Sequence, residues 1–177
     1  MEYPAGWSPQ TESPSGCLSL GGTYRNVPSA VVPEGAQAVE LRQFLLPRHV
    51  FAREWQSQQR SDVQSVTIEQ GKDFATITEH GDSTTRTSRL RILDISAYVF
   101  VTPPDGVGCT RVLWMRVGKE VGGATPVSLL VENSGWSIFK AEDGSLSVRL
   151  LSGTAGLVGP VPVSDQKLTW YRYDQVR

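Results

Sequence analysis

The sequence predicts a mostly β protein, an antiparallel meander of eight or nine strands that is barrel-like, or alternatively a sandwich, with one early helix. Two observations indicate this fold. From about residue 62 onward, short runs alternate apolar and polar residues, and tight-turn signals separate these runs. Strands joined in series by short turns pair antiparallel. We favour the barrel because its closure removes exposed sheet edges.

The chain of 177 residues has the usual length of one domain and can bury a core without a metal or a disulfide. Residues 1–16 are rich in Pro, Ser and Gly, which predicts a flexible tether. No internal repeat or further boundary follows. We therefore expect a tether over residues 1–16 and a single β domain over residues 17–177.

In the early part of the domain, Gly21–Asn26 is a candidate for a short first strand, and Glu34–Leu46 predicts a helix. Pro47 ends the helical pattern, and residues 48–60 either extend the helical region or form a long loop. Four apolar residues at helical spacing carry the helix prediction: Ala38, Leu41, Phe44 and Leu45.

The later strands are expected to follow one another with short connections. Asp143-Gly144 is the strongest turn signal, because Gly adopts the positive φ that a tight hairpin needs. Gly122-Gly123 and Asn133–Gly135 also predict turns, and Gly153–Val163 predicts an irregular stretch that includes at most a short strand. The expected strands are Val66–Ile68, Phe74–Glu79, Arg86–Leu93, Tyr98–Val101, Thr110–Val117, Val127–Glu132, Trp136–Lys140, Leu146–Leu150 and Leu168–Tyr173.

The two cysteines, Cys17 and Cys109, are either idle thiols or one disulfide that pins the end of the tether to the domain. We favour the disulfide, since an even count fits an exported chain. The bridge would close a loop of roughly 90 residues and stabilise the fold by up to about 4 kcal/mol. Residues 1–16 lack the basic start and apolar core of a signal peptide. Either the protein is not exported or the chain shown begins after a leader, and we favour the second interpretation.

Composition argues against several function classes. The formal net charge of -1 argues against a broad phosphate-binding surface, so no nucleic-acid partner is expected. No run reaches the roughly 18 apolar residues of a membrane-spanning helix. The cysteines and the two histidines, His49 and His80, show no ligand-pair spacing, so no metal site is expected. Without a Gly-x-Ser-x-Gly elbow or a phosphate loop, the sequence predicts no catalytic residue and no cofactor.

Two groups of side chains are candidates for ligand binding. Arg89 and Arg91 share one face of a predicted strand and could bind an anionic group, although a solvated outer face opposite Leu90 and Ile92 is the favoured interpretation. Aromatic residues on strands could line an apolar cavity, although an ordinary β core has the same pattern. The aromatic candidates are Trp114, Trp136 and Trp170.

Three short motifs resemble small Gram-negative cell-envelope lipoproteins of unknown function: Gly22–Asn26, Ala141–Leu146 and Thr169–Tyr173. The layout is also loosely similar to lipocalins, with Tyr24 in the place of their first tryptophan and Arg172 in the place of their late basic residue. The missing tryptophan and the early helix depart from that pattern. The resemblance implies export and membrane tethering through a preceding N-terminus, and it supplies no catalytic residues.

These observations together favour a non-catalytic periplasmic or outer-membrane-associated protein that binds an apolar small molecule or an envelope protein. A purely structural or interaction module is the alternative, and a hydrolase using His49 or His80 is the third possibility. An exposed apolar patch beyond a few hundred Å² would favour the interaction module over a ligand cavity.

Overall fold

The structure, a computed structural model, describes residues 2–14, 16–45, 62–94, 106–125, 128–158 and 160–176. For residues 94, 106, 116–125 and 128–134 it describes the backbone alone. The segment 48–60, the predicted strand Tyr98–Val101 and His49 lie outside the described residues.

The described strands form one sheet in the order β1-β3-β4-β5-β6-β7-β8-β9-β10-β2. All neighbouring strands pair antiparallel except β5 and β6, which pair parallel. The mostly β, mostly antiparallel prediction is confirmed. The elements are β1 (Gly22–Arg25), β2 (Ala30–Val32), α1 (Leu41–Leu45), β3 (Val63–Gln70), β4 (Phe74–Gly81), β5 (Thr85–Asp94), β6 (Gly106–Cys109), β7 (Trp114–Thr125), β8 (Ser128–Lys140), β9 (Leu146–Val158) and β10 (Val161–Tyr173).

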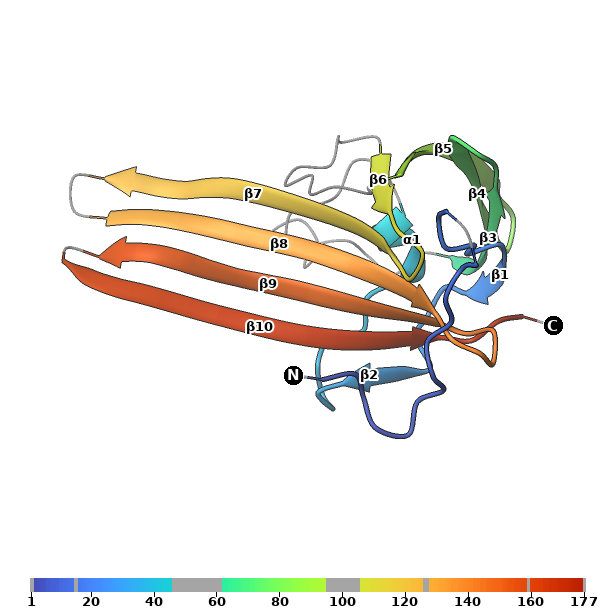
Figure 1. The fold of residues 1–177 in the computed structure, drawn as a ribbon, viewed down its shortest axis with the longest axis horizontal. Helices are drawn as coiled ribbons and strands as arrows, with labels where there is room; N and C mark the ends of the chain where they lie inside the picture. Colours follow the sequence, from blue (N-terminus) through green and yellow to red (C-terminus); the bar gives the residue numbers. More distant parts are fainter. Residues whose placement is uncertain are drawn as a thin grey trace.

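Figure 1 shows two parts of this sheet. Strands β1 and β3–β6 curl around one end of the molecule, and the long strands β7–β10 run side by side well beyond it toward the opposite end. We call the part of β7–β10 beyond the core the projecting sheet. It comprises residues 116–125, 128–135, 151–158 and 161–168.

The sheet is not closed, so the favoured barrel is realised only as an open one. The strands β1 and β2 are the two ends of the sheet. Residues just after β10 nevertheless reach β1, since the Arg25 amide donates to the Asp174 carbonyl at 3.0 Å and the Val176 amide donates to the Thr23 carbonyl at 2.8 Å. This short contact brings the two ends of the curved sheet together, although no continuous ladder of hydrogen bonds joins β10 to β1.

The core lies inside this curve, where strand alternation places the apolar residues. The helix α1 fills the curve with Phe44, whose ring lies 5.6 Å from that of Tyr171 and 6.3 Å from that of Trp136 between centroids. The Tyr173 hydroxyl donates to the Val39 carbonyl at 2.6 Å and fixes the segment before α1. The largest fully buried side chains are Trp114, Tyr24, Tyr173, Phe44, Leu20, Leu41, Leu45, Ile68, Ile77, Leu90 and Ile138.

The helix prediction is right in kind and wrong in extent. Of the residues predicted as helix, Glu34 to Glu40 are not helical. Gly35 adopts a φ of 82°, and the Ala36 amide donates to the Pro33 carbonyl, so this stretch begins as a turn. The helix starts only where Asn26 satisfies its free amides, through its carbonyl to the Leu41 amide and its Oδ1 to the Arg42 amide.

The hairpin prediction at Asp143-Gly144 is confirmed: Gly144 has a φ of 86°, and its amide donates to the Ala141 carbonyl. Three other turn or loop predictions are wrong. Gly122-Gly123 lies within β7, Asn133–Gly135 within β8, and Gly153–Val163 contributes to the paired strands β9 and β10. Pairing with neighbouring strands overrides these local turn signals.

The segment predicted as a flexible tether lies along the sheet. The Thr11 amide donates to the Lys140 carbonyl at 2.8 Å, and the Ser13 amide donates to the Arg111 carbonyl at 2.7 Å. A single bridge also pairs Gln10 with Ala141. We call residues 2–14 the N-terminal segment.

Candidate functional site: the projecting sheet

Two of the predicted aromatic binding residues belong to the core. Trp114 is fully buried, and its indole Nε1 donates to the Leu18 carbonyl at 2.9 Å. Trp136 is 3% exposed and lies against Phe44. Both rings therefore pack the inside of the curved sheet.

Trp170 lies on the opposite face of the sheet, under the N-terminal segment. Its ring is 5.3 Å from that of Tyr3 in an edge-on arrangement, and Tyr3 in turn contacts Trp7 at 6.0 Å. Phe139 and the guanidinium of Arg149 complete this cluster, with Arg149 5.9 Å from the centre of the Trp170 ring. The three predicted tryptophans thus do not share one cavity.

Arg89 and Arg91 lie exposed on the outer face of β5. The Arg89 guanidinium stacks over the Phe74 ring at 4.4 Å. Leu90 and Ile92 point inward between them and are buried. Strands β6–β9 separate β5 from β10, so these arginines lie on another part of the sheet from Trp170.

The predicted disulfide is present between Cys17 and Cys109, whose Cα atoms are 5.3 Å apart. Cys109 is fully buried at the end of β6. Next to the bridge, the Leu18 amide donates to the Thr110 carbonyl at 2.7 Å. A structural disulfide of this kind indicates an exported, non-cytoplasmic protein.

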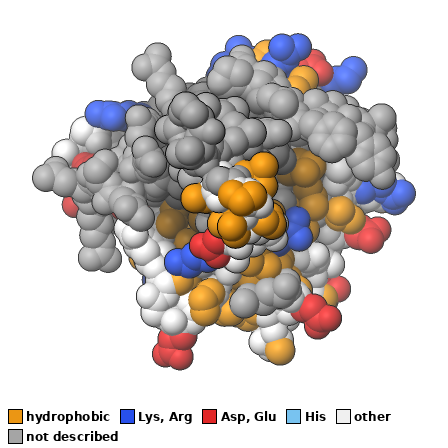
Figure 2. All heavy atoms as spheres, turned by 90° about the vertical axis from the view of Figure 1, so that its left-hand side faces the viewer, with side chains coloured by type: hydrophobic (Ala, Val, Ile, Leu, Met, Phe, Trp, Pro, Cys, Tyr) orange, Lys and Arg blue, Asp and Glu red, His pale blue; other side chains and the backbone are white. Residues whose placement is uncertain are grey.

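A second set of exposed residues lies on the projecting sheet, where sequence analysis predicted no site. Leu151, Leu157, Val158, Val161 and Val163 are exposed on the β9–β10 hairpin, with Val161 reaching 57%. Figure 2, viewed from the end toward which β7–β10 project, shows hydrophobic side chains gathered near the centre of that face. Scattered exposed apolar residues are normal, but a group at the end of one hairpin indicates an interaction site.

The register of the four strands places charged residues in one row across the projecting sheet. Glu120 of β7 pairs with Glu132 of β8, which pairs with Thr154 of β9, which pairs with Asp165 of β10. The described residues beyond this row are 121–125, 128–131, 155–158 and 160–164, and we call them the apical region. None of them is Asp, Glu, Lys or Arg.

Sequence analysis missed the apical region because its glycines and prolines were taken as breaks between elements. A usable signal was nevertheless present. Uncharged stretches of similar length follow Glu120 and precede Asp165, and an uncharged hairpin end would produce this pattern.

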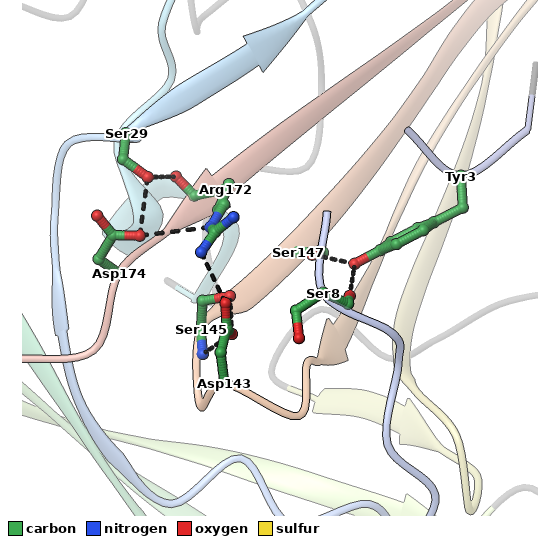
Figure 3. A network of polar contacts seen from close by, with 8 residues as sticks. All are labelled: Tyr3, Ser8, Ser29, Asp143, Ser145, Ser147, Arg172 and Asp174. Carbon is green, nitrogen blue, oxygen red and sulfur yellow. Dashed lines mark hydrogen bonds and ion pairs between the residues drawn. The ribbon is translucent and has the colours of Figure 1, made fainter. Parts of the chain in front are cut away.

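At the other end of the long strands, a polar network fixes the β8–β9 turn (Figure 3). The Asp143 carboxylate accepts hydrogen bonds from the Ser145 amide at 3.0 Å and from the Ser145 hydroxyl at 2.6 Å. The Arg172 guanidinium donates to the same carboxylate at 2.7 Å and also faces Asp174 at 3.4 Å. Partial burial alone would raise the pKa of Asp143, but the Ser145 hydrogen bonds and the Arg172 charge lower it below 3.8 overall.

Asp143→Asn is expected to lower the free energy of unfolding by roughly 0.5–1 kcal/mol at pH 7, a small loss because the ion pair is partly exposed. Since the folded-state pKa is depressed, the contribution of Asp143 is present above about pH 4. This contribution is lost as pH falls through the folded-state pKa of Asp143. The free energies of unfolding of Asp143→Asn and of the original protein should therefore converge near pH 2. Urea unfolding at both pH values checks this. Asp174→Asn, at the longer contact, should have the smaller effect, and a difference that persists at pH 2 would contradict the role of the carboxylate charge.

A buried charged group anchors α1 to the sheet. Glu79 is 5% exposed on the inner face of β4, and its Oε1 lies 3.5 Å from a guanidinium nitrogen of Arg42. The Arg42 Nε also donates to Glu40 at 2.7 Å. This arrangement holds the helix against β4, which is a structural role.

His80, the histidine within the described residues, lies on β4. Its Nε2 is 2.9 Å from the Thr67 hydroxyl, so the ring takes part in a cross-strand contact. Over the described part of the chain, no group of three or more His, Cys, Asp or Glu side chains could hold a metal ion.

Comparison with protein-family models, with curated proteins and with solved structures gives no match for this chain. Within the described ranges, no helix is long and apolar enough to cross a membrane. The candidate site therefore depends on the geometry of the projecting sheet.

Proposed function

We propose that this chain is an exported, non-catalytic binding protein of the bacterial cell envelope, periplasmic or associated with the outer membrane. Its binding element is the projecting sheet, which makes contact with an apolar surface of another envelope component. The exposed apolar side chains at the end of the β9–β10 hairpin carry this proposal. The disulfide supports the exported location.

The shape of the molecule supports this division of roles. The curved end contains the helix, the disulfide and most of the fully buried side chains. The projecting sheet extends away from them, so it is accessible to a partner without any rearrangement of the core (Figure 1). A stable core attached to a rigid, paired sheet is suited to recognition, because the binding residues are already ordered before the partner binds.

A small apolar ligand within the curve is a second candidate. The buried Nε1 of Trp136 has no hydrogen-bond acceptor among the described residues, and a ligand oxygen could accept from it. A stoichiometric compound in native mass spectra of the purified protein would favour this candidate.

Photo-crosslinking in the source cells tests the proposed binding element. A benzophenone amino acid at Val161 is expected to give covalent adducts with a lipid or a protein. The same probe at Val176, which is 45% exposed at the other end of the molecule, should give none. The adduct at position 161 should disappear in a Leu157→Asp background. Equal labelling from positions 161 and 176 would refute the projecting sheet as the binding element.

A further inference from the structure

We propose that the apical region inserts shallowly into the surface of a lipid bilayer. This inference rests on the proposed function, since it names the partner of the projecting sheet. The apical region enters the layer between the lipid headgroups and the acyl chains. The row formed by Glu120, Glu132 and Asp165 marks the depth of insertion.

The absence of charge in the apical region is the first argument. Charged residues make up 20% of the chain, so about four would be expected among the 18 residues of this region, and there are none. From the acidic row to the end of β9 the strand advances four residues, which is about 13 Å at the usual rise. That length covers the roughly 5–10 Å to which interfacial segments enter a bilayer.

The exposed apolar side chains lie on both faces of the hairpin. Leu157 and Val158 are neighbours on β9 and therefore point to opposite faces, yet they are 47% and 50% exposed. Val161 pairs with Val158 across the hairpin and is also exposed. A flat protein surface would cover one face, whereas a fluid hydrocarbon phase surrounds both.

The residue types also favour lipid over a protein partner. The apical region contains only Val, Leu, Ala, Gly, Pro, Thr and Ser. Protein interfaces depend on Trp, Tyr and Arg for most of their binding energy, and none of these occurs here. Aliphatic side chains without a directional group suit contact with acyl chains.

Neither β7 nor β10 has another described strand paired to its outer side within the projecting sheet, and both edges carry features that oppose strand addition by another chain. On β10, the Arg172 carbonyl accepts a hydrogen bond from the Ser29 amide, so the backbone groups of Arg172 point away from β9. Because backbone groups alternate in direction along a strand, those of every second residue, including Pro162, also point to the outer edge of β10. Pro162 has no amide to donate there. On β7, the register shifts between Gly122 and Ala124, which interrupts the other edge. End-on contact is therefore favoured over edge pairing.

The same features reduce the penalty for entering the bilayer. Within the apical region, the strands pair with one another from β7 to β10, which satisfies the interior backbone groups. Pro162 removes one unpaired donor from an edge. The apical region contains no Lys or Arg, so binding should not require an anionic lipid.

Flotation with lipid vesicles tests the inference on the full chain. Binding to phosphatidylcholine vesicles is expected at roughly 0.15 M salt, and adding roughly a quarter of phosphatidylglycerol should not strengthen it. Leu157→Asp combined with Val161→Asp should reduce the partition coefficient at least about tenfold, since two aspartates would have to enter the apolar boundary. Val176→Asp is the matched control and should bind like the original protein.

A second measurement keeps the test valid if the double variant folds poorly. Amide hydrogen exchange of the unmodified protein should slow at residues 155–158, 161, 163 and 164 when phosphatidylcholine vesicles are added, and not at Gly22–Arg25. Absence of flotation, absence of this protection, or an equal loss in Val176→Asp would overturn the bilayer proposal. If crosslinking from position 161 gives protein adducts while vesicles do not bind, the bilayer inference fails and the proposed function stands.

Discussion

Replacing both Cys17 and Cys109 with serine is expected to lower the free energy of unfolding by about 4 kcal/mol. The bridge joins residues 92 positions apart, and closing a loop of that length restricts the unfolded chain by about this amount in the chain-entropy model. Native stabilities are usually about 5–15 kcal/mol, so the variant should be marginally stable. Urea unfolding of the variant and of the parent protein measures the difference.

The disulfide also restrains the adjacent chain. Leu18 follows Cys17, and its backbone both donates to Thr110 and accepts from the Trp114 indole. The N-terminal segment ends just before the bridge and covers Trp170 through Tyr3. The variant should therefore show increased exposure of Trp170 before global unfolding, seen as a red-shifted tryptophan emission. The parent protein in reductant serves as the control and should match the variant. A loss below about 1 kcal/mol would contradict this account.

The free energy of unfolding is also expected to fall steeply above pH 10. Three core tyrosines, Tyr24, Tyr171 and Tyr173, have pKa values raised by burial, to about 12 for Tyr171. Because the folded-state pKa is higher than the unfolded value of 10.0, their contribution is fully present below pH 10. It is lost as pH rises from 10 toward the folded values. With up to three protons involved, at about 1.4 kcal/mol each, the slope approaches about 4 kcal/mol per pH unit.

Tyr24→Phe tests this slope. The variant should lose about 1 kcal/mol at pH 8, because the Tyr24 hydroxyl no longer donates to the Leu20 carbonyl. Its stability should nevertheless fall less steeply between pH 10 and 12, with one proton fewer involved. Burial lowers the pKa of Lys140, which acts in the opposite direction but only up to about pH 10.5. Denaturant unfolding at intervals from pH 8 to 11.5 gives both slopes, and identical slopes would contradict the assignment.

Local sequence signals correctly predicted those elements whose conformation depends on neighbouring residues alone. The Asp143-Gly144 hairpin followed from glycine's positive φ, and the alternation of Val66 and Ile68 with polar residues correctly indicated the strand β3. The length of β7–β10 could not be predicted this way, because it depends on pairing between distant residues. Gly153 illustrates the point: it resembles a break in sequence, but a Cβ there would collide with the Asp165 carbonyl oxygen of the paired strand.

The candidate site was harder to predict than the fold. Aromatic residues were selected for an apolar cavity, yet Trp114 and Trp136 pack the core. Trp170 was placed correctly on a strand, but the sequence could not show that Tyr3 covers it from the N-terminal segment. The apical region contains no aromatic or charged residue, and its meaning depends on the register that brings Glu120, Glu132 and Asp165 into one row.

The strand order also constrains how the protein can be assembled after export. The strand β2 is one of the first to emerge, yet its neighbour is β10, where Ala30 pairs with Arg172. The bridge between Cys17 and Cys109 can close once residue 109 has crossed the membrane, whereas β2 has no partner strand until residues 170–172 arrive. During translocation the chain thus passes through a stage that is already cross-linked but still has an unpaired strand, and at that stage the strand is open to pairing with other chains.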